Sequence, residues 1–465
     1  MSKNTTLNLT EGPILKTLAR LALPIMASSF LGTAYNITDM AWIGTLGSSA
    51  VAGVGAGGMY VWLSQGLVTL ARMGGQVNAA QCIGKKRTND ARKYTAAALQ
   101  LTIILGILYG IVCLFFTEGL IGFFHLNNMQ SQASAIIYTR ITCGLILLPY
   151  LNLTLTGLFT AQGDSKTPFK ANLIGLILNM LLDPALILGI GPFPHMGVSG
   201  AAIATVTAQL IVFLVLLRGV FQGNPQESIL RGIHLFSKTP VSYYRTICKI
   251  GIPAAVQGLI YTSISMVLTR MVAAFGSGAV ATQRVGGQIE SLSWNTADGF
   301  AAALNAFTAQ NLGAGKHQRI RRGYSLSLRI LLIWGALITA AFIGFPGPIA
   351  HIFFHEKEVV RIAEEYLFII GIGEAFMSVE LMTVGALSGL GLTKLCSILT
   401  ILLTAARIPL AVLFTHAGMG LSGIWWALTL SSIVKGIVYY FTFRHVSRRL
   451  GFQKRIVSES TGQKR

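Results

Sequence analysis

Residues 171–190 read ANLIGLILNMLLDPALILGI, an almost wholly apolar stretch that carries Asn172, Asn179 and Asp183. Successive residues of an α-helix are about 100° apart, so these three side chains lie within about 40° of one another. One polar stripe on an apolar helix is typical of a membrane span that lines a wet cavity. Inserting an ionisable side chain at that depth costs roughly 2.5–3.5 kcal/mol of free energy on insertion scales, so such a residue is rare unless it has a function. An aspartate that merely accepts structural hydrogen bonds is the less favoured alternative, because Asp39 is a second acid in a comparable setting.

The composition indicates an integral membrane protein. Hydrophobic residues make up 53% of the 465 and charged residues 11%, against about 25% charged in a soluble domain. Lysine and arginine cluster in alternate connecting loops, whereas loops such as residues 44–49 and 190–196 hold none. This positive-inside pattern predicts a multi-pass protein of the plasma membrane, the inner membrane of the cell, with both termini cytoplasmic. The net charge of +20 then reflects topology and contact with anionic membrane lipid, and we expect no nucleic-acid partner.

Hydropathy and loop signals predict an all-α membrane protein with twelve transmembrane helices. The expected spans are residues 14–44, 49–81, 93–117, 133–162, 168–190, 197–221, 246–276, 279–311, 323–350, 361–389, 393–415 and 421–446. A polar linker near the middle separates two sets of six. The expected parts are an N-terminal six-helix lobe (1–221), a cytoplasmic linker (222–245), a C-terminal six-helix lobe (246–446) and a basic cytoplasmic tail (447–465).

The two sets of spans are similar in sequence. Pro24 aligns with Pro253 at an offset of 253 − 24 = 229. Other pairs at this offset are Gly47 with Gly276, Gly58 with Gly287, Gln81 with Gln310 and Arg92 with Arg321. Later pairs are Gly157 and Gly163 with Gly385 and Gly391 at 228, and Gly197 and Gly200 with Gly420 and Gly423 at 223. Six spans per copy give both copies the same orientation, which implies a pseudo-two-fold axis along the membrane normal, as in rocking secondary transporters.

Catalytic and cofactor motifs are missing from the sequence. Gly53, Gly55 and Gly58 spell GxGxxG, but inside a membrane helix this pattern indicates helix packing rather than a dinucleotide site. No GxxxxGK[ST] motif and no nucleophile set occurs, and none of the five cysteines forms a CxxC pair. We therefore expect neither an enzyme nor a protein with a cofactor or a metal site.

Several polar residues of the first half are predicted to form one pocket. Tyr35 and Asn36 precede Asp39 by four and three residues, so all three share a helix face. Tyr138 and Asn152, 14 residues apart, align within about 40° on the fourth span. Together with Asn179 and Asp183, these residues would form a low-dielectric pocket that holds two carboxyl groups, those of Asp39 and Asp183. Burial disfavours the doubly ionised pair, and the two protons titrate as a coupled set. Such a pocket can hold a proton at neutral pH and release it when water reaches the pocket from the other side of the membrane.

Three segments carry a family resemblance: YNITDMAWIG at 35–44, GLFTAQGDSKTP at 157–168 and LNMLLDPALI at 178–187. They resemble the multidrug and toxic compound extrusion (MATE) family, and the resemblance extends over all twelve spans. The chain is most similar to the DinF-like branch.

The resemblance implies roles for individual residues. It assigns proton coupling to Asp39 and Asp183, with Asn179 one turn before the second acid. Pocket positions of that branch are matched by Tyr35, Asn152 and Tyr138. The resemblance also suggests that Pro24 lets the first helix bend as protonation changes.

The second half departs from the NorM-like branch, which places a carboxylate on the seventh helix. Residues 246–276 contain no acid, and this argues against a sodium site of that type. Candidate residues for a second-lobe site are Glu290, Asp298, Glu374 and Glu380. Glu380 aligns with Asn152 (380 − 152 = 228). It is expected either to bind cations or to pair with Arg284 or Arg407, since intramembrane charges commonly pair.

These features favour a secondary antiporter that exports amphipathic small-molecule organic cations in exchange for protons by alternating access. We expect it to act as a monomer. Alternatives are a sodium-coupled exporter of the same family or a lipid-linked precursor flippase of the same superfamily. A flippase would need a cationic cleft, for which Arg270, Arg284 and Arg407 are candidates. A membrane-embedded lipid enzyme ranks last because no catalytic constellation is recognisable.

Overall fold

The computed structural model of the chain describes residues 7–124, 128–191, 193–222, 228–233, 238–354 and 356–462. These residues form helices and connecting turns, with no β-strand among them. The first half contains α1 (Ile14–Gly44), α2 (Ser48–Gly84), α3 (Thr88–Gly122), α4 (Met129–Gly144), α5 (Leu147–Ala161), α6 (Lys166–Leu188) and α7 (Gly197–Gln222). The second half contains α8 (Val241–Ala273), α9 (Ser277–Gly313), α10 (His317–Gly344), α11 (Pro346–Phe353), α12 (Lys357–Gly389), α13 (Thr393–Ala405), α14 (Arg407–Phe414), the π-helical turn η1 (Thr415–Met419) and α15 (Gly420–Gly462).

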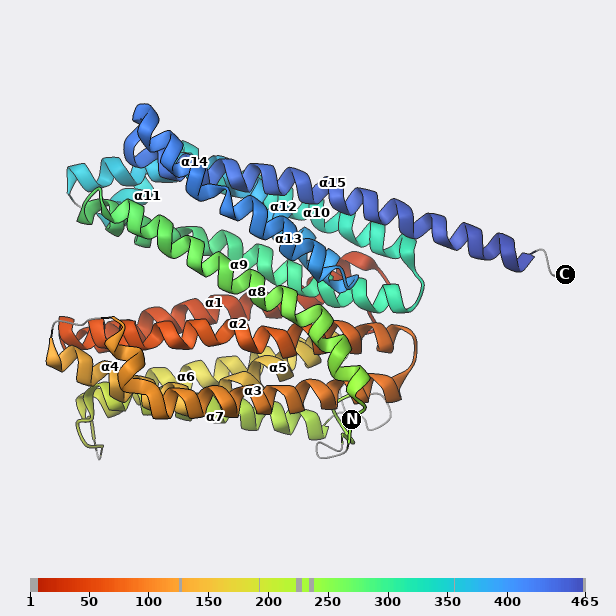
Figure 1. Cartoon of the computed structure of the whole chain (residues 1–465), viewed down its shortest axis with the longest axis horizontal. Helices are drawn as coiled ribbons and strands as arrows, with labels where there is room; N and C mark the ends of the chain where they lie inside the picture. The colour runs from red at the N-terminus through yellow and green to blue at the C-terminus, as the bar shows by residue number, and fades with distance from the viewer. Residues whose placement is uncertain are drawn as a thin grey trace. The chain divides into compact units, whose positions relative to one another are not determined.

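These elements correspond to the twelve predicted spans. Three of the predicted spans are broken: α4 and α5 are bent by 46° at their junction, α10 ends at Gly344 before α11 begins at Pro346, and α13 gives way to α14 at Ala406. In the described chain, eight helical stretches are long and apolar enough to cross a membrane, or nine with the bent pair. One of the eight, Thr393–Arg449, contains two spans, because positive φ angles at Gly418 and Gly420 turn the chain between α14 and α15 (Figure 1). The long helices α2 and α9 complete the twelve and are less apolar.

The chain divides into two compact units. Unit 1 comprises Met1–Asn8 and Leu23–Ala255, and unit 2 comprises Leu9–Ala22 and Val256–Arg465. The divisions therefore fall inside α1, next to Pro24, and inside α8, next to Pro253. The predicted linker, residues 222–245, lies partly outside the described residues, and the predicted tail, residues 447–465, is helical as far as Gly462.

Unit 1 is built around α2, which packs against α3, α4 and α5, while α6 packs against α7 (Figure 1). The first part of α8 also belongs to this unit. Its Tyr243 hydroxyl donates to Asp90 Oδ1 on α3 at 3.1 Å. Its Gly251 lies directly against the backbone of α2, where any Cβ would overlap the carbonyl oxygen of Leu70.

We therefore expect Gly251→Val to destabilise unit 1 by about 1–3 kcal/mol, the usual effect of overpacking. The measurement is the thermal unfolding midpoint of the purified protein at one scan rate. Gly258→Val is the matched control on the same helix, because a Cβ at Gly258 would meet nothing within 4 Å. Equal midpoints for the two variants would contradict the predicted close contact.

Unit 2 centres on α12, which packs against α9, α10 and α15 (Figure 1). The start of the chain is tied to this unit by one guanidinium group. Arg319 donates to the carbonyl oxygens of Leu9 (3.3 Å), Glu11 (2.7 Å) and Gly12 (2.7 Å). Asn311 also donates to Leu9 O at 3.0 Å. These bonds explain why residues 9–22 belong to unit 2.

Candidate functional site

Both predicted acids of the first half lie inside unit 1. Asp39 is on α1 and is 7% exposed, and Asp183 is on α6 and is fully buried. Their charges interact with each other and with the hydroxyl groups of Tyr35 on α1 and Tyr138 on α4. The structure therefore brings four of the predicted site residues into one cluster.

The carboxyl oxygens of this cluster are only partly satisfied. Asn179 donates from Nδ2 to Asp183 Oδ1 at 3.1 Å, one turn along α6. Asp39 Oδ1 and Asp183 Oδ2 are buried and have no hydrogen-bond partner among the described residues. Among the described residues, no Lys, Arg or His nitrogen lies within 4.0 Å of either carboxylate. Buried acceptors of this kind call for an explanation.

An apolar cluster closes one side of the acids. Ile43 follows Asp39 by one turn, and Ile187 follows Asp183 by one turn. Both isoleucines are fully buried in a cluster that also contains Tyr138. This side of the two acids is therefore packed with buried side chains that are mostly apolar.

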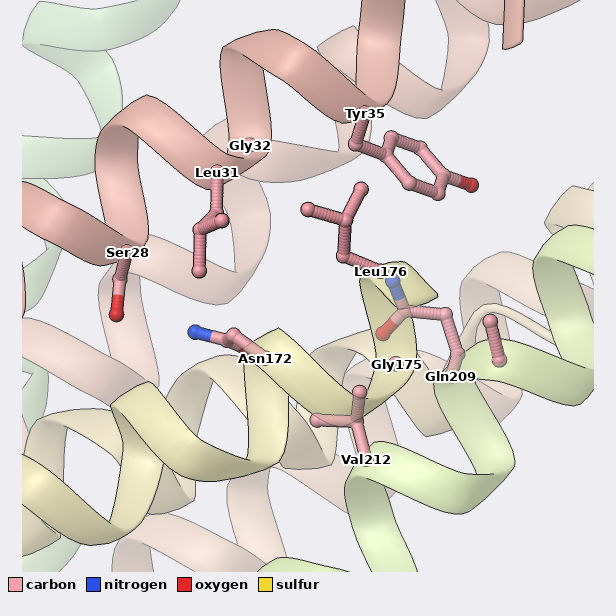
Figure 2. Close-up of a pocket in the computed structure, with 10 residues that line it drawn as sticks. Ser28, Leu31, Gly32, Tyr35, Asn172, Gly175, Leu176, Gln209 and Val212 are labelled. Carbon is pink, nitrogen blue, oxygen red and sulfur yellow. The ribbon is translucent and has the colours of Figure 1, made fainter. Parts of the chain in front are cut away.

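A cavity of about 190 Å³ lies on the other side of the acids, between α1, α6 and α7. Figure 2 shows Tyr35 from α1, Asn172 from α6 and Gln209 from α7 around this cavity. Along the helices, Tyr35 is roughly 6 Å before Asp39, and Leu176, another lining residue, is roughly 10 Å before Asp183, at 1.5 Å per residue. Asp39 and Asp183 thus lie between the cavity and the apolar cluster.

The hydroxyl and amide groups beside the cavity hold one another in place. Tyr35 donates to Thr205 Oγ1 on α7 at 3.0 Å. Asn152 on α5 donates from Nδ2 to Gln209, both to its side-chain Oε1 (2.8 Å) and to its carbonyl oxygen (2.9 Å). Gln209 therefore links the predicted residue Asn152 to the cavity wall.

Two further residues of the first half lie apart from the acids. Asn36 is exposed and is not among the residues that line the cavity. It is 60° from Asp39 around α1 and about 100° from Tyr35, at the edge of the predicted face. Pro24 lies within α1, which runs unbroken from Ile14 to Gly44.

The four second-half acids do not form one cluster. Glu290 on α9 accepts from the Tyr366 hydroxyl at 3.3 Å, and its charge interacts with that of Glu374 on α12. Glu374 is 1% exposed, and its Oε2 has no hydrogen-bond partner in the described part of the chain. Asp298 is exposed on α9. Glu290 and Glu374 therefore make a pair, and Glu380 belongs to a separate interaction.

Glu380 corrects one prediction. It was expected to bind cations or to pair with Arg284 or Arg407, but it pairs with Lys435 on α15, with Oε1 and Nζ 2.8 Å apart. Both side chains are buried, at 8% and 3% exposure. Arg284 is exposed, as is Arg270, whereas Arg407 is buried against two serines.

Three residues of these contacts were not predicted: Lys435, Gln209 and Thr205. Each is a polar residue in a mostly apolar span, which is the kind of signal that singled out Asp183. Each of the three is positioned by a hydrogen bond or ion pair to a residue distant in the sequence, which no local motif indicates.

The comparisons with known proteins agree with this architecture. The family model described as MatE matches the chain twice, at residues 24–185 and 253–413. The two matches start 253 − 24 = 229 residues apart, the offset of the predicted repeat. This confirms the internal duplication.

Curated relatives match over most of their length. A "Probable multidrug resistance protein NorM" of Thermotoga maritima is 28% identical over 422 residues, 89% of this chain and 88% of the relative. An "FAD transporter" of Shewanella oneidensis is 25% identical over 446 residues, 94% of this chain and 96% of the relative.

A solved structure, "Crystal structure of MATE in the bent conformation", shares the fold. Its TM-score is 0.89 at 23% identity, and the match covers 97% of this chain and 99% of that one. The all-α architecture with twelve transmembrane helices is thereby confirmed. With the twofold family match and the relatives of nearly equal length, the chain belongs to the MatE family of membrane transporters, the MATE family that its motifs predicted.

Proposed function

We propose that the protein is a secondary antiporter that exports amphipathic organic cations in exchange for protons. The observation that carries the proposal is the pair Asp39 and Asp183, which is buried without a basic partner in the described chain. Its position between a cavity and an apolar cluster supports access from one side at a time.

Competition for these acids would couple the two fluxes. With the pair ionised, its negative charge in a low-dielectric site attracts a cation strongly. Proton uptake neutralises the pair and weakens that attraction, so the cargo leaves and the proton takes its place. The two conformations would then differ in their affinity for each ligand, which alternating access requires.

The cavity and α1 would both change shape during the cycle. At about 190 Å³, the cavity is smaller than the roughly 300–1,000 Å³ of ordinary small-molecule sites, so cargo entry needs it to widen. Pro24 lies on the same helix as Asp39 and removes one backbone hydrogen bond. Bending at Pro24 would move Tyr35 and Asp39 with little loss of helix stability.

Ion gradients imposed on proteoliposomes test the proposal. The purified chain is reconstituted, a fluorescent organic cation is loaded, and its movement is followed under either a pH gradient or a sodium gradient of equal size. We expect the pH gradient alone to drive transport, with measurable proton counterflow. Transport driven by sodium and indifferent to the pH gradient would contradict proton coupling.

Sodium exchange is the second candidate, favoured by the Glu290 and Glu374 pair in unit 2. A buried carboxylate oxygen without a partner in the described chain, a second carboxylate and the phenol of Tyr366 are hard oxygen ligands. Such ligands suit a small hard cation. Sodium-driven transport that is lost in Glu374→Gln and kept in Asp183→Asn would favour this alternative.

A further inference from the structure

We propose that unit 2 contains an anion-binding site centred on Arg407, which recognises a carboxylate or phosphate group on a small molecule. This inference goes beyond the proposed function and does not depend on it. It is based on the repeat, the contacts of Arg407 and the charge balance around it.

The repeat places Arg407 where unit 1 has its acid cluster. Arg407 corresponds to Asn179, with 407 − 179 = 228, the offset of the glycine pairs that precede them. At the same offset Asp183 corresponds to Ala411, and at 229 Asp39 corresponds to Leu268. At these aligned positions unit 2 therefore carries a cation and no acid.

Arg407 is buried without an ion-pair partner in the described residues. It is 6% exposed, and it donates from Nε to Ser431 Oγ and from an Nη to Ser432 Oγ, both at 3.1 Å. No carboxylate in the described chain lies within 4.0 Å of it, and Glu290 acts on it only from a longer distance. The other buried cation nearby, Lys435, is already paired with Glu380.

A buried cation of this kind is costly without a counter-charge. Guanidinium is the group best suited to supply two parallel hydrogen bonds to a carboxylate or phosphate. Arg407 is 14 residues beyond the start of α13 and 7 before the end of α14, or roughly 21 Å and 10 Å along the helices. That depth favours the anionic group of a small molecule over a lipid headgroup.

The exposed aromatic side chain next to Arg407 is Tyr261. It corresponds to Gly32, with 261 − 32 = 229, and Gly32 lines the open cavity of unit 1. In unit 2 the ring of Tyr261 lies over the guanidinium, 5.9 Å from its centre, and is itself 45% exposed. Rotation of this side chain would remove the aromatic contact with the guanidinium.

Two flavins that differ only in a phosphate test the site. The purified protein in phosphatidylcholine nanodiscs is titrated with flavin mononucleotide and with riboflavin, and binding is followed by fluorescence anisotropy. We expect flavin mononucleotide to bind roughly tenfold or more tightly, as a charge-assisted bidentate contact implies. Inorganic phosphate should compete. Displacement by added phosphatidylglycerol but not by inorganic phosphate would assign the same site to a lipid headgroup.

Variants connect this preference to Arg407. Arg407→Gln should remove the preference for the phosphate and leave riboflavin binding unchanged, whereas Arg407→Lys should keep part of it. Arg284→Gln, the same substitution at an exposed position in unit 2, is the control and should bind as the wild type does. The proposal fails if the wild type binds flavin mononucleotide no tighter than riboflavin, or binds neither, whether or not Arg407→Gln folds. It also fails if a folded Arg407→Gln protein keeps the preference. Because this experiment measures flavin binding and the earlier one measures cation transport, the anion site can be disproved while the proposed antiport stands, or the reverse.

Discussion

Replacing Asp183 with Asn should reduce pH-driven export of an organic cation to the level of vesicles without the protein. Asparagine keeps the shape of the side chain but can neither take up nor release a proton. Losing one partner of a buried charge pair, here the carboxylate that attracts the bound cation, costs about 2–5 kcal/mol, so cation affinity should also fall by roughly thirtyfold or more. Asp39→Asn should act in the same direction, because its carboxyl belongs to the same cluster.

The measurement is efflux of a fluorescent cation in everted vesicles under a fixed pH gradient, at matched protein levels. Glu118→Gln is a suitable control, since Glu118 is an exposed acid of unit 1 that pairs with Arg140 at the surface. Folding should survive in Asp183→Asn, because no basic partner in the described chain loses its counter-charge. Wild-type export by both aspartate variants would show that the proposed coupling is wrong.

Breaking the buried pair of Glu380 and Lys435 should give the largest loss of stability in unit 2. Both side chains are at most 8% exposed, and removing one partner leaves an uncompensated charge in the interior. That change costs roughly 3–5 kcal/mol. Glu380→Gln and Lys435→Met should each lower the thermal midpoint strongly, whereas the double variant Glu380→Gln/Lys435→Met should recover most of the loss.

Thermal unfolding of the solubilised protein, at one scan rate, gives the comparison. Glu11→Gln is the control, because Glu11 and Lys316 form an exposed pair 4.0 Å apart, and such pairs contribute at most about 1 kcal/mol. A double variant that is less stable than either single variant would contradict the interpretation. Single variants as stable as the wild type would show that the pair is not a strong interaction.

Much of the architecture was predictable because membrane burial imposes one-dimensional rules. Long apolar segments must be helices in lipid, and the offset of 229 residues between the two prolines is visible in the sequence alone. The breaks inside the spans were predictable only in their approximate position. Pro149, in the first turn of α5, removes the hydrogen bond to the carbonyl oxygen of Leu145 and so marks the bend between α4 and α5, but the sequence does not give its angle of 46°.

The candidate site shows the same division. Helical periodicity placed Asn179 and Asp183 on one face, and the structure joins them by a hydrogen bond. The same periodicity could not decide which side of α1 faces the bundle, so Asn36 was included although it is exposed. The helical period gives the angle between two side chains around the helix axis, but the neighbouring helices decide which face of the helix points into the bundle.

The sequence by itself determined the twelve apolar spans, their duplication and the presence of two intramembrane acids, because spacing and composition are local properties of the chain. Only the tertiary structure decided which distant side chains meet. It paired Glu380 with Lys435, left Arg407 without a carboxylate partner in the described chain, and placed Asp39 and Asp183 between a cavity and an apolar cluster. These outcomes depend on the rotation and depth of each helix against its neighbours, which are set by packing across the whole unit.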